Sequence, residues 1–435
     1  MRRSILLAAL LALISSCDPD SKPEVAAPSP PPVAKTSSEP ARPLGPPQLP
    51  RDRTEGYLAA AAAYERGDFA KSEELRLKLP SSFDVELLGA RLLAARGDEI
   101  AAVRAIESAR ARLPGQTRVQ ATAAEIHAAA LRFDSAEAEI REGLALSGPT
   151  PDLTRARGVL ALVRENGARK GLEHLLAARE AEPALEFCAQ PLSQAHLLLG
   201  NAALAAQDAL DAAGHAKAAL AAQPDDLDAT LLLSDALAAA GEFAQALELR
   251  ERALERGADV RGALGLLYAR AGTAALLAPE RPLAVQRFLR ARELGLSDEE
   301  LGFGATVLEE ELRAAVDAGV TAYDAGSFAE ARAKFTEALR FDRASIEVHN
   351  HLGVVNFKLG EFAAAVDEWT QVLDLARKSS LALPEPVHLN LARALHKAGR
   401  RDEIRKVLDD YLAREPQGEF AAETREMLAR LDAEK

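Results

Sequence analysis

Apolar and small residues recur along most of the chain with the spacing of one helical face, in paired runs that repeat about every 34 residues. Residues 195–224 show the unit clearly, with one face formed by Leu197, Leu199, Gly200, Ala203 and Leu204. A break follows at residues 207–208, and a second helical face then runs as far as Pro224. Proline ends a helix because it lacks the amide hydrogen and crowds the preceding turn. The pattern predicts antiparallel helix pairs from about Arg53 to Pro416.

A second regularity lies inside the pairs. A small residue of the first helix is followed twelve positions later by a small residue of the second, at Gly200 and Ala212, Ser234 and Ala246, Gly272 and Ala284, Gly319 and Ala331, and Gly353 and Ala365. Small residues at matched positions allow two helices to approach closely. Neither helix is apolar enough to fold alone, so each pair is expected to bury its outer face on the next pair.

The turns inside the pairs share a glycine and a phenylalanine. They read Gly67-Asp68-Phe69, Gly241-Glu242-Phe243, Gly326-Ser327-Phe328 and Gly360-Glu361-Phe362. Glycine ends a helix in the left-handed conformation at little cost, and a polar or acidic residue suits the start of the next helix. We expect the phenylalanine to pack into the turn.

These residues resemble the pattern of tetratricopeptide repeat proteins. The copies that carry the resemblance are Leu199-Gly200, Ala203, Ala212, Ala216, Ala219 and Pro224; Tyr268, Ala271-Gly272, Ala275, Ala284, Phe288 and Ala291; Ala318-Gly319, Ala322, Gly326, Ala331, Phe335 and Ala338; and Leu352-Gly353, Gly360, Ala365 and Trp369. Six copies after about Ser193 match well and four before it are degenerate. The last copy departs at Ile404 and Ala392. The resemblance implies an all-α fold, a right-handed superhelical solenoid of about ten stacked helix pairs.

The organisation expected along the chain has five parts. These are a lipoprotein signal peptide at 1–16, a lipidated cysteine with a disordered proline-rich tether at 17–50, degenerate repeats at 51–192, well-matched repeats at 193–417 and a capping helix at 418–435. Within this plan we expect a soft joint near 182–193 and an acidic insertion at 299–311 that lengthens a helix.

The N-terminal segment is typical of an export signal. Arg2-Arg3 precedes the apolar stretch 5–14, which is too short to span a bilayer permanently. Residues 14–17, Ile-Ser-Ser-Cys, resemble the lipobox of bacterial lipoproteins, which implies cleavage before Cys17 and acylation of its sulfur. An ordinary signal peptide or a membrane-tethering helix is the alternative. Asp18 favours retention at the inner membrane only weakly, so the choice of membrane stays open.

The proline-rich residues 18–50 contain almost no large apolar side chains and cannot form a core. At ~3.1 Å per residue they reach at most ~100 Å. We interpret them as a tether, with a docking peptide for a proline-binding domain as the alternative.

Composition narrows the function classes. The chain has 48% apolar but only 4% aromatic residues and a net charge of −13 without a basic block, so we expect no nucleic-acid partner. Phosphate-binding loops, nucleophile elbows and metalloprotease motifs are missing from the sequence, and we expect neither an enzyme nor a cofactor. Cys188 fits a buried structural thiol or an intermolecular disulfide. A metal site is an unfavoured alternative for His349, His351, His388 and His396, which also fit packing or groove polarity.

The resemblance implies that ligands lie along the inner surface formed by the first helix of each pair. The positions that match this surface near the C-terminus are Tyr323, Asn350, Phe357, Lys358, Arg393, His396 and Lys397. Aromatic platforms beside cations are suited to an acidic or C-terminal peptide segment, and a solvated helix face is the alternative. Val354 stands where the carboxylate-clamp members of the family carry an asparagine, so that clamp is not carried over.

The sequence therefore predicts a lipid-anchored, periplasm-facing adaptor that binds protein or peptide partners at the bacterial cell envelope. The alternative is an architectural subunit of one fixed envelope complex, for outer-membrane assembly, a pilus or secretion, that binds through its convex face and ends.

Overall fold

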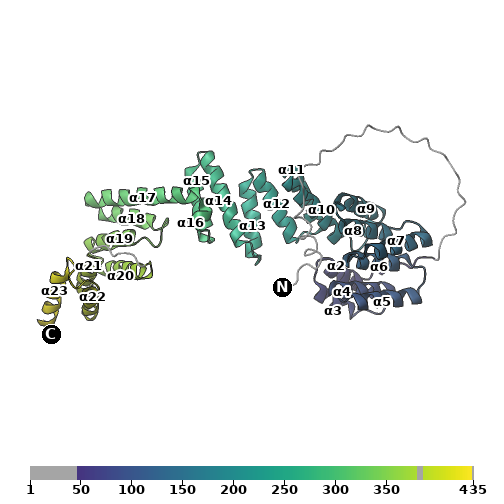
Figure 1. Cartoon of the computed structure of the whole chain (residues 1–435), viewed down its shortest axis with the longest axis horizontal. Coiled ribbons are helices and arrows are strands. Elements are labelled where there is room, and N and C mark those ends of the chain that lie inside the picture. The colour runs from purple at the N-terminus through teal and green to yellow at the C-terminus, as the bar shows by residue number, and fades with distance from the viewer. Residues whose placement is uncertain (1–46, 380–385, 434–435) are drawn as a thin grey trace. The chain divides into compact units, whose positions relative to one another are not determined.

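A computed structural model describes residues 47–379 and 386–433 of the chain. The signal peptide, Cys17 and most of the tether lie outside the described residues. The described residues form 22 helices and no strand, and divide into two compact units, Met1–Arg256 and Gly257–Lys435 (Figure 1). None of these helices is long and apolar enough to cross a membrane.

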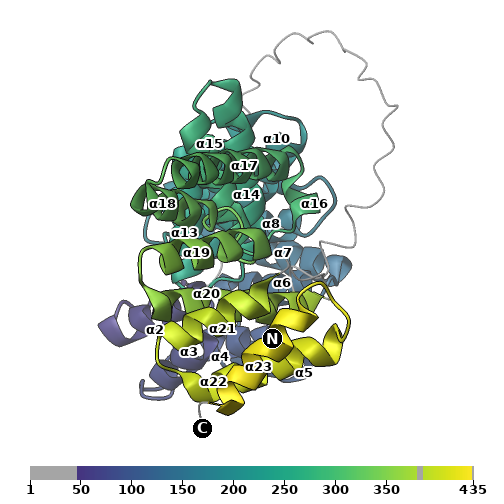
Figure 2. The same cartoon turned by 90° about the vertical axis from the view of Figure 1, so that its left-hand side faces the viewer.

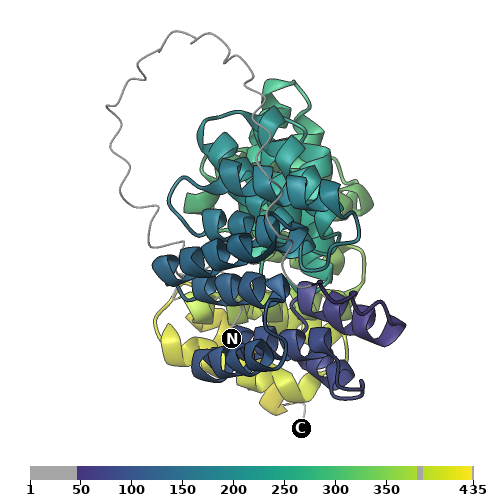
Figure 3. The same cartoon turned by 90° about the vertical axis from the view of Figure 1, so that its right-hand side faces the viewer.

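Unit 1, Met1–Arg256, contains six helix pairs in its described part (Figures 1 and 3). Its first helices are α2 (Glu55–Glu65), α4 (Phe83–Ala95), α6 (Thr117–Ala129), α8 (Pro151–Leu162), α10 (Ala189–Ala205) and α12 (Leu227–Ala239). Its second helices are α3 (Phe69–Arg76), α5 (Glu99–Arg112), α7 (Phe133–Ser147), α9 (Ala168–Ala181), α11 (Ala209–Ala222) and α13 (Phe243–Glu255). Neighbouring first helices contact one another from α2 to α12, which makes them one continuous layer.

Unit 2, Gly257–Lys435, contains four pairs, a short inserted helix and a final helix (Figure 2). The pairs are α14 (Arg261–Leu277) with α15 (Arg281–Glu293), α17 (Phe303–Asp324) with α18 (Phe328–Ala338), α19 (Ile346–Lys358) with α20 (Phe362–Ser379), and α21 (Val387–Lys397) with α22 (Arg401–Arg414). The acidic insertion forms α16 (Asp298–Leu301) and lengthens α17, as predicted. The final helix, α23 (Ala421–Ala433), packs on α22 where the sequence predicts a cap.

The small-residue rule is confirmed by the packing. The five second-helix members of the predicted pairs are fully buried. At Ser234 the hydroxyl donates to the Ala246 carbonyl at 2.8 Å, and Ser72 does the same to Ala60. At Gly353 an added Cβ would lie 2.6 Å from the Trp369 indole, and the same relation links Gly319 to Phe335. Glycine is therefore required wherever the second helix presents a large ring.

The predicted turns are also confirmed. Gly67, Gly241, Gly326 and Gly360 have φ between 74° and 86°, and the phenylalanine that follows begins the second helix each time. In three of the turns this ring meets an aromatic ring at the end of the first helix. These pairs are Tyr64–Phe69, Tyr323–Phe328 and Phe357–Phe362, with centroids 5.3–5.4 Å apart.

The soft joint expected near residues 182–193 is wrong. This segment lies inside unit 1, where Glu186 and Cys188 are buried, and the two units divide at Arg256 and Gly257 instead. Tertiary contacts hold the segment in place, because Glu186 pairs with Arg53 and Phe187 packs against Arg91.

Candidate functional site

The inner layer of unit 1 carries buried charges rather than an open ligand surface. Asp84 on α4, Arg118 on α6, Asp152 on α8 and Glu186 after α9 are each less than a tenth exposed. Arg118 pairs with Asp84 at 2.5 Å across 34 positions, and Asp152 lies 34 positions further along the sequence. Equivalent positions of successive repeats thus form a ladder of charges.

Arg155 is the centre of this network. Its guanidinium donates to Glu125 at 2.7 Å, to Asp152 at 3.1 Å and to the Glu186 carbonyl at 2.8 Å. Burial lowers the pKa of Arg155, but the two carboxylates outweigh burial and raise it. The same balance lowers the pKa of Asp152, whose desolvation is more than offset by its pairing with Arg155 and Arg51. These groups are charged and fully paired, and a buried charge without its partner is strongly destabilising.

Residues 182–188, which connect α9 to α10, pack against this layer. Phe187, held at φ 62°, places its ring 4.4 Å from the Arg91 guanidinium and 5.6 Å from the Tyr64 ring. Arg91 also pairs with Glu125. The cation–π contacts on Phe187 therefore close the layer near α4 and α8.

Residues 47–53 cover the same layer and pair with segment 182–188. Arg51 pairs with Asp152 at 2.5 Å and with Glu182 at 2.7 Å, and Arg53 pairs with Glu186 at 2.6 Å. The Gln48 side chain accepts from the Thr117 amide at 2.9 Å. The last four residues of the range predicted as a tether are thus bound to unit 1. We call Asp84, Arg118 and Asp152 the inner charge row of unit 1. Residues 47–53 and 182–188 of the same chain cover this row.

This charge network was not predicted, although the sequence contains a signal for it. The spacing of 34 between Arg91 and Glu125, and between Asp84 and Arg118, places opposite charges at equivalent repeat positions. Searching each repeat position for alternating charge would have found the ladder.

The seven predicted groove positions lie on three first helices of unit 2. Tyr323 is on α17; Asn350, Phe357 and Lys358 are on α19; and Arg393, His396 and Lys397 are on α21. Helices α19 and α21 contact one another, so six of the seven residues lie on neighbouring elements.

Three of the seven are engaged in packing. Tyr323 meets Phe328, and Phe357 meets both Phe362 and Trp369. Asn350 accepts a hydrogen bond from the Trp369 indole at 3.0 Å. These side chains hold each pair together, and the partly exposed edges of the two rings are what a ligand can meet.

The four basic positions differ from one another. Arg393 pairs with Glu423 at 2.5 Å and thereby links α21 to α23. Lys358, His396 and Lys397 are exposed and form no ion pair with any residue that the structure describes. Of the predicted cations, Lys358 and Lys397 are therefore available to a ligand, and the exposed His396 lies beside Lys397 in the sequence.

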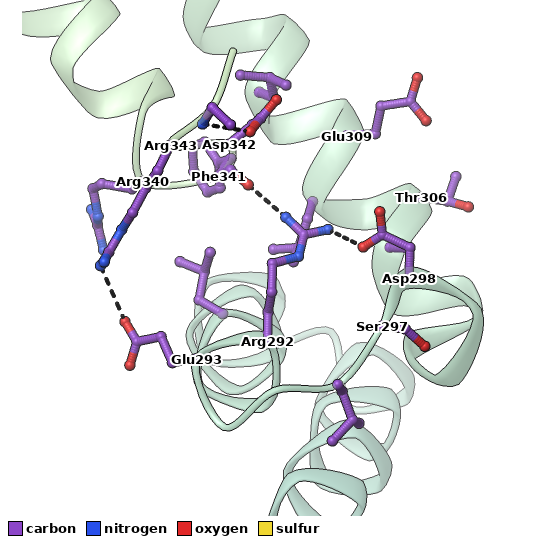
Figure 4. Close-up of a pocket in the computed structure, with 16 residues that line it drawn as sticks. Arg292, Glu293, Ser297, Asp298, Thr306, Glu309, Arg340, Phe341, Asp342 and Arg343 are labelled. Carbon is purple, nitrogen blue, oxygen red and sulfur yellow. Dashed lines mark hydrogen bonds and ion pairs between the residues drawn. The ribbon is translucent and has the colours of Figure 1, made fainter. Parts of the chain in front are cut away.

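A hollow of about 830 Å³ opens beside the insertion in unit 2 (Figure 4). It is bordered by the end of α15, by α16, by the first half of α17 and by residues 340–344 between α18 and α19. Leucine side chains and Phe341 supply apolar surface, and both signs of charge surround it. None of the seven predicted groove residues lines this hollow.

Arg292 fixes the geometry of this hollow. It donates to the Phe341 carbonyl at 2.5 Å and to Asp298 at 2.6 Å, so it joins the insertion to the next loop (Figure 4). Arg343 approaches Glu293 at 3.7 Å on the other side. The hollow is an amphipathic surface suited to a peptide segment that carries apolar and charged groups.

His349 and His388 of unit 2 serve packing in this structure. His349 shares a hydrogen bond with Glu368 at 2.7 Å, which raises its pKa against the effect of burial. His388 packs against Tyr411 with the two rings tilted by 48°, and burial lowers the pKa of His388 to about 4. The described residues include no group of three or more histidine, cysteine, aspartate or glutamate side chains placed to hold a metal ion.

Cys188 is buried beside the charge network of unit 1. Burial raises the pKa of its thiol to about 11. A neutral, inaccessible thiol agrees with a structural role, the first of the two interpretations offered by the sequence.

No protein-family profile and no curated protein sequence matches this chain. Several solved structures resemble it. The C-terminal part of a TPR repeat-containing protein from Cytophaga hutchinsonii is 14% identical, with 61% of this chain and 99% of that chain covered and a TM-score of 0.36. The TPR2AB-domain:pHSP90-complex of yeast Sti1 is 15% identical, with 55% and 96% covered and a TM-score of 0.26.

Pseudomonas aeruginosa pilF is 18% identical, with 55% of this chain and 99% of that chain covered and a TM-score of 0.23. Because these TM-scores are low, the assignment of a helical repeat solenoid rests on the helix pairs of the chain itself.

Proposed function

We propose that the chain is a non-enzymatic adaptor for protein partners at the bacterial cell envelope, anchored by acyl chains on Cys17, and that unit 2 contacts the partner. One observation carries this proposal. The inner charge row of unit 1 is occupied by residues 47–53 and 182–188, whereas α19 and α21 of unit 2 expose three cationic or titratable side chains without ion pairs in the described part of the chain.

The partner chemistry follows from those side chains. Lys358, Lys397 and His396 favour carboxylates, and the exposed edges of Tyr323 and Phe357 favour apolar side chains. An acidic or C-terminal peptide segment combines both properties.

The test is in-cell crosslinking followed by mass spectrometry, with Lys358→Glu/Lys397→Glu compared with wild type. Arg393 stays unchanged because its reversal would also break its pair with Glu423. Phe357 stays because it packs on Trp369. We expect a dominant partner to be lost in the double variant.

The control is Lys217→Glu/Lys406→Glu, which makes the same change of charge at exposed lysines of the second helices α11 and α22. The control variant should retain the partner. Equal retention in both variants would contradict the assignment to α19 and α21.

Anchoring has its own test. Cys17→Ser should move the protein from the membrane fraction to the soluble fraction and abolish incorporation of a clickable fatty acid, because stable anchoring depends on the acyl chains. Unchanged fractionation and labelling would contradict the lipoprotein part of the proposal and leave the adaptor part standing.

A second candidate is an architectural subunit of a fixed complex that binds through outer faces. The observation in its favour is a set of exposed large apolar side chains, with Leu210 and Leu277 each 85% exposed. If Leu210→Ser/Leu277→Ser removes the crosslinked partner while Lys358→Glu/Lys397→Glu retains it, this second candidate replaces the first.

A further inference from the structure

Unit 1 carries a separate hollow lined by residues of α7, α8, α9 and the loop between α8 and α9, and none of the buried charges of its inner layer lines it. It has a volume of about 580 Å³. Its floor is apolar and includes Ile140 and Leu160. One cation comes from each of the three helices: Arg141 from α7, Arg157 from α8 and Lys170 from α9.

These three cations are exposed and have no ion-pair partner among residues 47–379 and 386–433. Arg164 also lines the hollow and is paired with Glu137 at 2.6 Å, while Glu165 lies at the rim. In a chain of net charge −13, three unpaired cations around one hollow are a local reversal of charge. The amide end of α9, which has no side-chain cap, opens at Gly167 in the same place and adds partial positive charge.

We propose that this basic hollow binds an acidic peptide segment that also carries leucine-like side chains. Carboxylates would pair with Arg141, Arg157 and Lys170, and the apolar side chains would lie on the floor near Ile140 and Leu160. The two carboxylates of the hollow interrupt the continuous basic track that a nucleic acid requires. An anionic bilayer calls for an outward basic face, whereas these cations surround a depression with an apolar floor.

The experiment measures fluorescence anisotropy of a labelled short peptide that alternates glutamate and leucine, titrated with the full chain at low salt. Wild type and variants all carry Lys358→Glu/Lys397→Glu, which removes the acidic-peptide surface proposed for unit 2. A matched peptide alternating glutamine and leucine controls for apolar binding. The variant is Arg141→Glu/Arg157→Glu/Lys170→Glu. The control variant is Arg104→Glu/Arg179→Glu/Lys217→Glu, which changes the charge equally at exposed cations of unit 1 outside the hollow.

We expect the acidic peptide to bind the wild type and the control variant alike, and to lose at least about tenfold in affinity for the hollow variant, since several pairs become repulsions. Equal affinity for both variants, or for the glutamine peptide, overturns the proposal. The acidic peptide could fail to bind while vesicles of anionic lipid bind the wild type and not the hollow variant. That result would overturn the peptide proposal and identify a membrane surface as the ligand of the hollow.

His174 provides a second readout inside the hollow. Burial lowers its pKa, and the nearby charges of Arg157 and Lys170 lower it further against the opposing charge of Glu173. Carboxylates bound beside these cations should raise the pKa of His174, which proton NMR measures directly. No rise on saturation with the acidic peptide would contradict binding in this hollow. The inference does not depend on the adaptor proposal, because the two are tested by variants in different units.

Discussion

The two units are built from the same helix pair but bury different side chains. In the described residues, every buried aspartate, glutamate and arginine lies in unit 1. In unit 2 the fully buried large side chains beside helix glycines are Phe288, Phe335 and Trp369. Helix pairs of this kind can thus be stabilised by ion pairs between neighbouring repeats or by aromatic rings packed on glycine within one pair.

The difference bears on function. Ion pairs between repeats tie α4, α6 and α8 to one another and to residues 47–53 and 182–188, so unit 1 has little inner surface left for a partner. In three pairs of unit 2 a ring of the second helix packs against a glycine of the first, and α19 and α21 keep Lys358, His396 and Lys397 exposed. The arrangement fits an N-terminal unit whose inner layer is covered by its own chain and a C-terminal unit whose first helices contact a partner.

The largest effect should come from breaking the charge network. Arg155→Ala leaves Glu125 and Asp152 buried with fewer partners, and we expect a loss of about 3–5 kcal/mol in the stability of unit 1. Trp369 is the only tryptophan of the chain and lies in unit 2, so its fluorescence in urea reports the unfolding of unit 2 and should not change. The circular-dichroism transition that reports the unfolding of unit 1 should shift to a lower urea concentration. The control is Arg164→Ala, which removes an exposed pair with Glu137 and should cost at most about 1 kcal/mol. Equal losses would contradict a network that depends on burial.

A smaller effect should appear as a pH dependence of unit 2. The pKa of His388 is lowered to about 4 by burial, so the unfolded chain takes up its proton first as the pH falls. Stability is then lost between about pH 6.5 and pH 4, by roughly 2–3 kcal/mol. His349 acts with the opposite sign because its pKa is raised, so the comparison must be between variants.

His388→Phe keeps a ring against Tyr411 and removes the titration. The stability difference between this variant and wild type, read from Trp369 fluorescence in urea, should grow as the pH is lowered through this range. A difference that is constant with pH would show that His388 does not titrate as described.

The smallest of the three effects concerns the rings of unit 2. Gly353→Ala places a Cβ 2.6 Å from the buried Trp369 indole, and overpacking of this kind costs about 1–3 kcal/mol. Gly214→Ala, on an exposed face of α11 with no atom within 4 Å, should instead stabilise unit 1 by about 0.5–1 kcal/mol. Thermal unfolding of both variants tests the pair. Stabilisation by Gly353→Ala would contradict the close approach at Trp369.

The sequence predicted the fold well because its signals are local. Gly-x-Phe turns and small residues twelve apart fix where each helix pair begins and how closely it packs, and both are confirmed. The described residues form ten helix pairs, in agreement with the about ten stacked pairs that the resemblance implies.

The site could be predicted only in part, because side chains in it contact the second helix of their own repeat or residues of other repeats. Asn350 was expected to face a ligand, but Trp369, on the next helix, donates to it. Arg91 is paired with a residue one full repeat away, and Phe187 reaches it from a segment that was expected to be a joint. Single-repeat patterns contain no information about such contacts. The seven groove residues and the lipid anchor stay predictions.

The most direct test of the account is a map of where the partner touches the chain. A photocrosslinking amino acid is placed in turn at four exposed positions. Two of them, Lys358 and Lys397, are in unit 2, and two, Arg104 and Lys217, are in unit 1. The account predicts adducts of one dominant partner at Lys358 and Lys397 and none at the unit 1 positions. Adducts confined to Arg104 and Lys217 would contradict the assignment of the partner to α19 and α21 of unit 2.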